Sequence, residues 1–108
     1  MLKCIRAAAL LAALLLAQVP LSHAEVDGEE FLDLMQSGEE GRKAAQFYID
    51  DVWQRWDEKV FCMPPGDRQQ MSFDAVEAYL ETHPQELYRP RRYLIVQGLR
   101  DAFACKSD

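Results

Sequence analysis

The sequence predicts an all-α protein, a small helical domain of about four helices with one disulfide. Apolar residues recur at three- and four-residue spacing in four segments, which is the period of an α-helix. Pro and Gly separate these segments, and no segment alternates apolar and polar residues for long enough to predict a strand. Cys62 and Cys105 lie in the second half of the chain and are the pair that the predicted disulfide joins.

Residues 1–24 are predicted to be a secretory signal peptide. Lys3 and Arg6 provide a positive start, residues 7–19 are almost all apolar, and residues 22–24 offer a small-x-small cleavage site. The apolar run of about 13 residues is shorter than the roughly 20 that cross a bilayer as a helix. We therefore favour cleavage over a membrane anchor.

The predicted mature domain, residues 25–108, is acidic. Loss of Lys3 and Arg6 leaves 10 basic and 18 acidic residues, a net charge of −8. This charge repels nucleic acid and anionic lipid, so we expect no nucleic-acid partner and no membrane association after cleavage. The charge is also segregated along the chain. All charged residues of the segment 25–40 are acidic, and all charged residues of the segment 89–100 are arginines.

Two helices are predicted in the first half of the domain. An apolar stripe over residues 31–35 predicts the first, which follows an acidic, frayed lead-in over residues 25–30 and stops at Gly38. Apolar residues that share one helical face predict the second helix. Its apolar residues are Ala45, Tyr48, Ile49, Val52, Trp53 and Trp56. The two tryptophans fit either the core or an interface, and core packing is the preferred interpretation.

A rigid connector over residues 61–66 precedes the third helix, because Pro64 and Pro65 cannot continue a helix. Asp67 is the expected N-cap of a helix over residues 68–82. Its expected inward residues are Met71 or Phe73, Val76, Tyr79 and Leu80. His83 precedes a proline and ends the helix.

The fourth helix is predicted from Pro90, a residue suited to the first helical position, to about Phe103. Its expected buried stripe consists of Leu94, Ile95, Leu99, Ala102 and Phe103.

Cys62 and Cys105 are predicted to form a disulfide, because they are an even pair in a chain sent to an oxidising compartment. Closing a loop of about 44 residues stabilises a fold by roughly 4 kcal/mol in the chain-entropy treatment. A catalytic thiol or a metal pair would need a reducing compartment or nearby histidines, and His83 is the one histidine of residues 25–108.

Residues 25–108 contain no recognisable motif of an enzyme, such as GxSxG, HExxH, CxxC or a Gly-rich phosphate loop. We therefore expect no catalytic residue, no metal and no other cofactor. His83 fits a helix C-terminal cap better than a catalytic base.

From Phe61 to Cys105 the chain carries an ordered set of motifs: a Cys-x-Pro connector, a Gln before an amphipathic helix, a Tyr-Leu-x-x-His-Pro step and a closing Phe-x-Cys. The positions are Cys62, Pro64, Gln69 or Gln70, Val76, Tyr79, Leu80, His83, Pro84, Glu86, Leu99, Phe103 and Cys105. In these motifs the chain resembles the Rap/Tai family of type VI secretion immunity proteins. It differs where family members often carry two more cysteines, since Met35 and Ala45 stand there.

The resemblance implies a periplasmic protein that binds a toxic effector and blocks it sterically without a cofactor. In the best-known cases the effector is a peptidoglycan amidase, a cell-wall-degrading toxin. The alternative is a periplasmic acid-stress chaperone of the HdeA type, because protonation of 18 carboxylates can expose apolar surface at low pH. Both a monomer and a homodimer are compatible with the sequence.

The turn from Glu81 to Arg92, between the third and fourth helices, is the candidate partner-binding site. Its candidate contact residues are His83, Glu86, Tyr88 and Arg89. Tyr88 is the preferred anchor, because it lies outside the helical stripes and interface energy concentrates on Tyr, Trp and Arg. The alternative is an exposed connector with no binding role.

Overall fold

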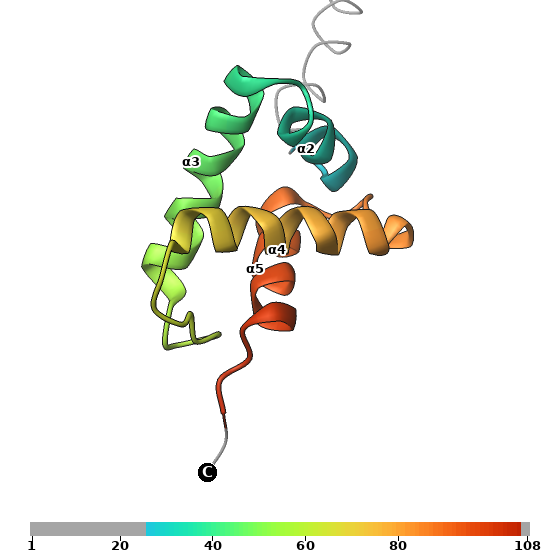
Figure 1. Cartoon of the computed structure of the whole chain (residues 1–108). Helices are drawn as coiled ribbons and strands as arrows, with labels where there is room; N and C mark the ends of the chain where they lie inside the picture. Colours follow the sequence, from blue (N-terminus) through green and yellow to red (C-terminus); the bar gives the residue numbers. More distant parts are fainter. Residues whose placement is uncertain (1–25, 107–108) are drawn as a thin grey trace, which may run out of the picture.

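The computed structural model describes residues 26–106, and within them it contains four α-helices, one short 3-10 helix and no β-strand (Figure 1). The elements are α2 (Gly28–Met35), α3 (Glu39–Trp56), α4 (Arg68–Thr82), η2 (Pro84–Glu86) and α5 (Arg91–Ala102). The predicted all-α fold is confirmed. The predicted signal peptide, residues 1–24, lies outside the described residues. None of the described helices has the length and apolar composition that crossing a bilayer requires.

Helix α2 begins earlier than the sequence predicts. Asp27 accepts a hydrogen bond from the Glu30 amide at 3.0 Å and so caps the first turn. Gly28, Glu29 and Glu30 are therefore helical, and the prediction of a frayed lead-in is wrong for these three residues. The helix stops before Gly38, which adopts a φ of 102° that other residues disfavour.

Helix α3 buries only part of its predicted apolar face. Ala45, Ile49 and Val52 are in the core, whereas the Tyr48 and Trp56 side chains remain 37% and 39% exposed. The prediction that these two aromatic residues are buried is wrong. Tyr48 lies on the flank of the stripe and Trp56 is the last residue of the helix, so the neighbouring helices do not enclose them.

Helix α4 matches its predicted bounds. The Asp67 side chain accepts a hydrogen bond from the Gln70 amide at 3.2 Å, as a capping residue should. The sequence left open whether Met71 or Phe73 faces the core. Phe73 is fully buried, and Met71 is partly exposed. The other three predicted inward residues of this helix are buried as well.

Helix α5 starts at Arg91, with Pro90 as its N-cap, one residue later than predicted. Leu94, Ile95 and Leu99 are buried, but Ala102 is exposed and Phe103 is half-buried. The predicted stripe is therefore too long. The last turn of α5 extends past the core toward the C-terminal segment (Figure 1).

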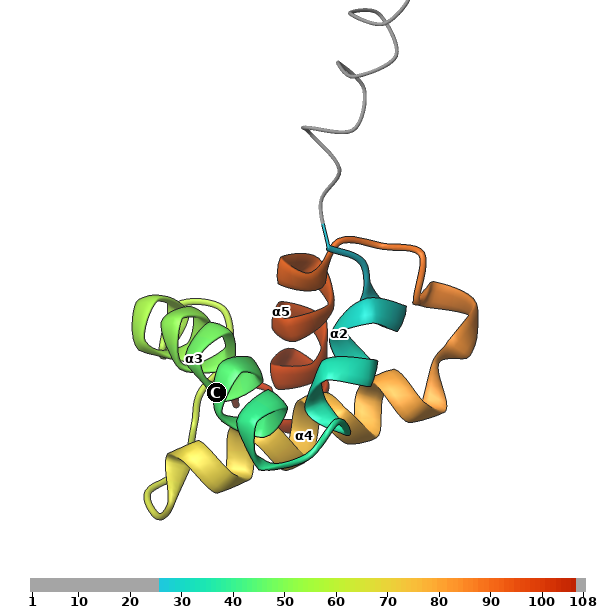
Figure 2. The ribbon, with the colours of Figure 1, turned by 90° about the horizontal axis from the view of Figure 1, so that it is seen from above.

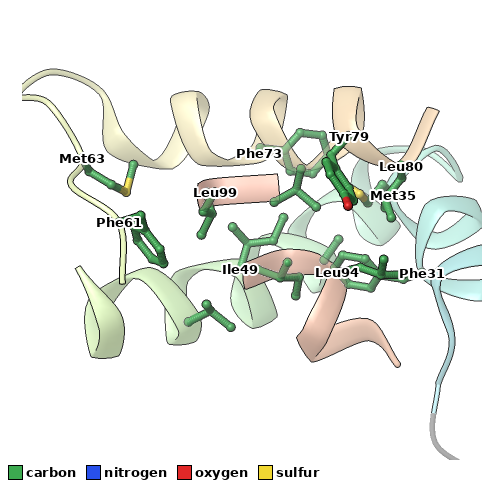
Figure 3. Packing of buried hydrophobic residues seen from close by; sticks show 14 residues of the cluster. Phe31, Met35, Ile49, Phe61, Met63, Phe73, Tyr79, Leu80, Leu94 and Leu99 are labelled. Atoms are coloured by element: carbon green, nitrogen blue, oxygen red, sulfur yellow. The ribbon is translucent and has the colours of Figure 1, made fainter. Parts of the chain in front are cut away.

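The core lies where α4 crosses α5, with α2 and α3 closing its sides (Figures 1 and 2). Phe31, Ile49, Phe61, Phe73 and Leu99 are fully buried and meet in one cluster (Figure 3). Gly98 allows the close crossing. A Cβ atom at Gly98 would lie 3.2 Å from the Cβ atom of Tyr79 and 3.3 Å from the Cα atom of Val76, tighter than ordinary contact.

The predicted disulfide between Cys62 and Cys105 is present in the structure, with Cα atoms 4.8 Å apart. The Cys62 amide also donates a hydrogen bond to the Phe103 carbonyl oxygen at 2.7 Å. Together these contacts fasten the end of α5 to the connector that precedes α4.

Candidate binding surface

The backbone of the turn between α4 and α5 is held by the start of α2. The Gly28 amide donates to the carbonyl oxygens of Leu87 at 2.9 Å and Arg89 at 3.0 Å. In return, the Arg91 amide donates to the carbonyl oxygen of Val26 at 2.9 Å. A Cβ atom at Gly28 would collide with the Leu94 side chain and lie 3.0 Å from the Leu87 carbonyl oxygen, so glycine favours this close approach of the two backbones. The turn is thus pinned on both sides and presents its side chains from a defined backbone.

Three of the four predicted contact residues belong to one side-chain network. The His83 ring stacks on the Tyr79 ring with centroids 3.9 Å apart, and its Nδ1 atom lies 2.9 Å from the Tyr79 carbonyl oxygen. The Tyr79 hydroxyl donates to Glu86 at 3.2 Å. Glu86 in turn lies 3.3 Å from the Nε atom of Arg89, an ion pair without the alignment of a hydrogen bond.

This geometry favours His83 as a helix cap, because its ring lies within hydrogen-bond distance of the Tyr79 carbonyl oxygen in the last turn of α4. His83 is the C-cap residue of α4. The network also perturbs Tyr79: burial raises its pKa above 10.0, and the hydrogen bond to Glu86 and the charge of Glu86 raise it further. The Tyr79 phenol is therefore neutral and serves as a hydrogen-bond donor at physiological pH.

Tyr88, the predicted anchor, is the residue of this group that projects from the protein. Its side chain is 71% exposed. The guanidinium carbon of Arg89 lies 5.3 Å from the centroid of the Tyr88 ring and 4.7 Å from that of Tyr93. Arg89 thus stacks against two tyrosines while Glu86 pairs with it. The structure brings all four predicted residues together, three as the support and Tyr88 as the exposed tip.

A groove that the sequence does not predict begins beside this turn, between the end of α3 and the start of α5. It has a volume of about 440 Å³ and is lined by Trp56, Val60, Pro90, Arg92, Tyr93 and Val96. Pro90 and Tyr93 connect it directly to the turn. Trp56 and Tyr93 are each more than a third exposed. Tyr93 could have been found as an aromatic residue outside the predicted stripe of its helix, whereas Trp56 was counted within a stripe. The meeting of the two residues depends on the helix packing.

This surface carries side chains suited to contact with a protein partner. In the part of the chain that the structure describes, no three His, Cys, Asp or Glu side chains gather as metal ligands. Both cysteines of this part are joined in the disulfide. Aromatic rings and arginines instead provide the groups that concentrate binding energy in protein interfaces.

Residues 27–105 match the family model of the Rap1a immunity proteins. No curated protein and no solved structure matches the chain. The family match spans almost all described residues, from the cap of α2 to the second cysteine of the disulfide. It gives no support to the acid-stress chaperone that the sequence left as an alternative.

Proposed function

This chain belongs to the Rap1a immunity protein family, and we propose that it protects the bacterial periplasm by inhibiting a toxic, cell-wall-degrading effector delivered by type VI secretion. The effector class that we propose is a peptidoglycan amidase. The observation that carries this proposal is the family match over residues 27–105, which covers all four helices and the disulfide.

A periplasmic location is part of the proposal. The sequence of residues 1–24 has the features of a cleaved signal peptide. The bond between Cys62 and Cys105 is of the kind that persists in oxidising compartments such as the periplasm. An inhibitor of cell-wall hydrolysis has to act in this compartment, because peptidoglycan lies there.

We expect steric inhibition, in which the turn between α4 and α5 covers or enters the active-site cleft of the effector. Tyr88 provides an exposed aromatic tip, and Arg89 supports it from the side. The backbone bonds from Gly28 hold the turn before binding, so little conformational freedom is lost when the complex forms. The protein itself turns over no substrate, and inhibition requires one molecule for each effector molecule.

The first experiment identifies the partner. The mature protein is immobilised and exposed to periplasmic extract from bacteria with active type VI secretion, and captured proteins are identified by mass spectrometry. The captured protein is then purified and given peptidoglycan, and the release of peptide stems is followed as the inhibitor is added. We expect release to stop at equimolar inhibitor.

Two controls make this result specific. The Tyr88→Ala, Arg89→Ala double variant should lose inhibition, whereas Lys43→Ala, at an exposed site on α3 that is not part of the turn, should retain it. Capture of a protein that does not cleave peptidoglycan would contradict the proposed effector class. Client protection that appears only in acid, with no effector captured at neutral pH, would contradict immunity altogether.

A further inference from the structure

The groove between α3 and α5 has the composition of an interface centre. Trp56, Tyr93 and Val96 provide apolar surface, and Arg92 stands at its edge. Trp, Tyr and Arg are the residues that most often carry binding energy. The Trp56 and Tyr93 side chains are 39% and 38% exposed, although both belong to helices that pack into the core. Burial of this surface by another molecule would therefore be favourable.

The charges around the groove select the occupant. Neither Arg91 nor Arg92 forms an ion pair with another residue of the described part of the chain. Arg92 also lines the neighbouring depression between Tyr48 and Ile95, so it stands where the two hollows meet. The guanidinium of Arg91 lies 3.8 Å from the centroid of the Tyr48 ring, which orients it beside the same depression. Asp51 also lines this depression, but it pairs with Arg55 at 3.3 Å, so Arg91 and Arg92 are the charges there without an ion-pair partner in the described part of the chain. In a domain of net charge −8, this makes the face locally suited to a carboxylate.

We propose that the groove binds a segment of the effector in which an apolar side chain is flanked by carboxylates. The apolar side chain enters between Trp56 and Tyr93, and a flanking carboxylate pairs with Arg92. This inference rests on the proposed function, which supplies the effector. It adds a second contact to the one made by the turn, and Tyr93 joins the two because Arg89 stacks on its ring.

A second copy of this chain is a poorer occupant for a physical reason. Arg92 lines both hollows, so a two-fold axis that passes where they meet would place Arg92 close to Arg92 of the other copy. Like charges brought together in this way oppose association. An acidic segment of a different protein would instead bring an opposite charge to Arg92.

The test uses the mature protein and a library of short random peptides displayed on phage. Peptides are selected on the wild-type protein and then depleted on the Arg92→Glu variant. We expect the remaining peptides to combine an aromatic or aliphatic residue with neighbouring Asp or Glu. A synthetic copy of the most enriched peptide should bind Arg92→Glu about tenfold or more weakly than the wild type. Binding to Lys43→Glu, a charge reversal of an exposed α3 residue outside the groove, should be unchanged.

Folding of each variant is checked by its melting temperature. Arg92 is exposed, so its replacement should leave the fold intact. Val96→Asp serves as a second variant that blocks the apolar part of the groove, and it should also lose the peptide. Peptides without acidic residues, or peptides that bind the wild type and Arg92→Glu equally, would overturn the proposal. Concentration-dependent dimers that Val96→Asp abolishes would assign the groove to a second copy and overturn it too.

Inhibition assays separate this inference from the proposed function. If Arg92→Glu inhibits the captured effector as well as the wild type does, while the Tyr88, Arg89 double variant does not, the groove proposal fails and the immunity function stands. If no peptidoglycan-cleaving effector is captured by the wild type, the proposed function fails, even where acidic peptides bind the groove.

Discussion

The two faces of α5 differ more in their surroundings than in their apolar composition. On one face Leu94, Gly98 and Leu99 are buried against α4 and the rest of the core. On the other face Tyr93 and Val96 are partly open to solvent at the groove. The disulfide fastens the segment that follows the helix to the connector before α4. The second face borders Trp56 and Val60 but stays partly exposed.

This difference separates stability from binding on a single helix. Replacement of a residue on the packed face removes contacts that hold the fold, and a cavity remains. Replacement of a residue on the open face removes little from the isolated protein, but it removes surface that a partner would bury. The two kinds of residue are therefore distinguishable by measuring unfolding and binding on the same set of variants.

Loss of the disulfide should have the largest effect on the unfolding free energy. The Cys62→Ser, Cys105→Ser double variant should lose about 4 kcal/mol of unfolding free energy, because its unfolded chain is no longer restricted by a long loop. Urea denaturation of the oxidised wild type and the variant measures this difference. The reduced wild type is the control and should behave as the variant does. Equal midpoints for the oxidised wild type and the double variant would show that the bond is dispensable.

Truncation of Leu99 should have the next largest effect. Leu99→Ala removes a fully buried side chain from the core, and we expect a loss of about 3 kcal/mol. Val96→Ala, one turn earlier on the open face, should lose no more than about 1 kcal/mol, because its side chain is only partly buried. Denaturation curves of both variants give the comparison. Similar losses for the two would mean that the faces of α5 do not differ as described.

Truncation of Tyr88 should act on binding alone. Tyr88→Ala should weaken binding to the captured effector by about 2 kcal/mol, whereas its melting temperature should stay within a few degrees of the wild type. Calorimetric titration and thermal denaturation provide the two readouts. A large drop in melting temperature would place Tyr88 among the structural residues, in conflict with its 71% exposure.

The smallest expected effect concerns Tyr79, which links the packed face to the turn. Because its folded pKa is raised above 10.0, ionisation is more costly in the folded than in the unfolded protein. The neutral Tyr79 phenol therefore contributes to the unfolding free energy at neutral pH, and this contribution is lost as the pH rises through the folded pKa of Tyr79. At pH 7 the Tyr79→Phe variant should be about 1 kcal/mol less stable than the wild type, because it lacks the hydrogen bond to Glu86. As the pH rises above 10, its unfolding free energy should fall less steeply than that of the wild type.

The pH dependence is measured by urea denaturation at a series of alkaline pH values. Tyr88→Phe is the matched control, since Tyr88 is exposed and contributes no buried hydroxyl. The control should follow the wild-type curve throughout. If the unfolding free energies of Tyr79→Phe and the wild type depend on pH in the same way, the expected coupling between Tyr79 and Glu86 is contradicted.

Local sequence signals predicted most of the fold. The capping aspartate Asp67, the helix-ending pair His83 and Pro84, and the cysteine pair act over short range or by simple counting, and their predictions are confirmed. Burial at the edges of helices was not predictable in the same way. Tyr48 and Trp56 fit the helical period but lie where no neighbouring helix covers them, and periodicity contains no information about where a neighbour ends.

The candidate surface was predicted in part for the same reason. The turn was found because Pro84 and Pro90 delimit it, and Tyr88 fell outside every stripe. The support from Gly28 and the groove at Trp56 depend on contacts between residues far apart in the chain. Only the packed structure places these residues beside the turn.

The most direct test of the central claim is a titration of the captured effector with the wild-type protein and with the Tyr88→Ala, Arg89→Ala variant, at neutral pH, with peptidoglycan cleavage as the readout. We predict that the wild type abolishes cleavage at equimolar concentration and that the folded double variant does not. Protection at far below equimolar wild type, or full inhibition by the double variant, would contradict stoichiometric inhibition through this turn.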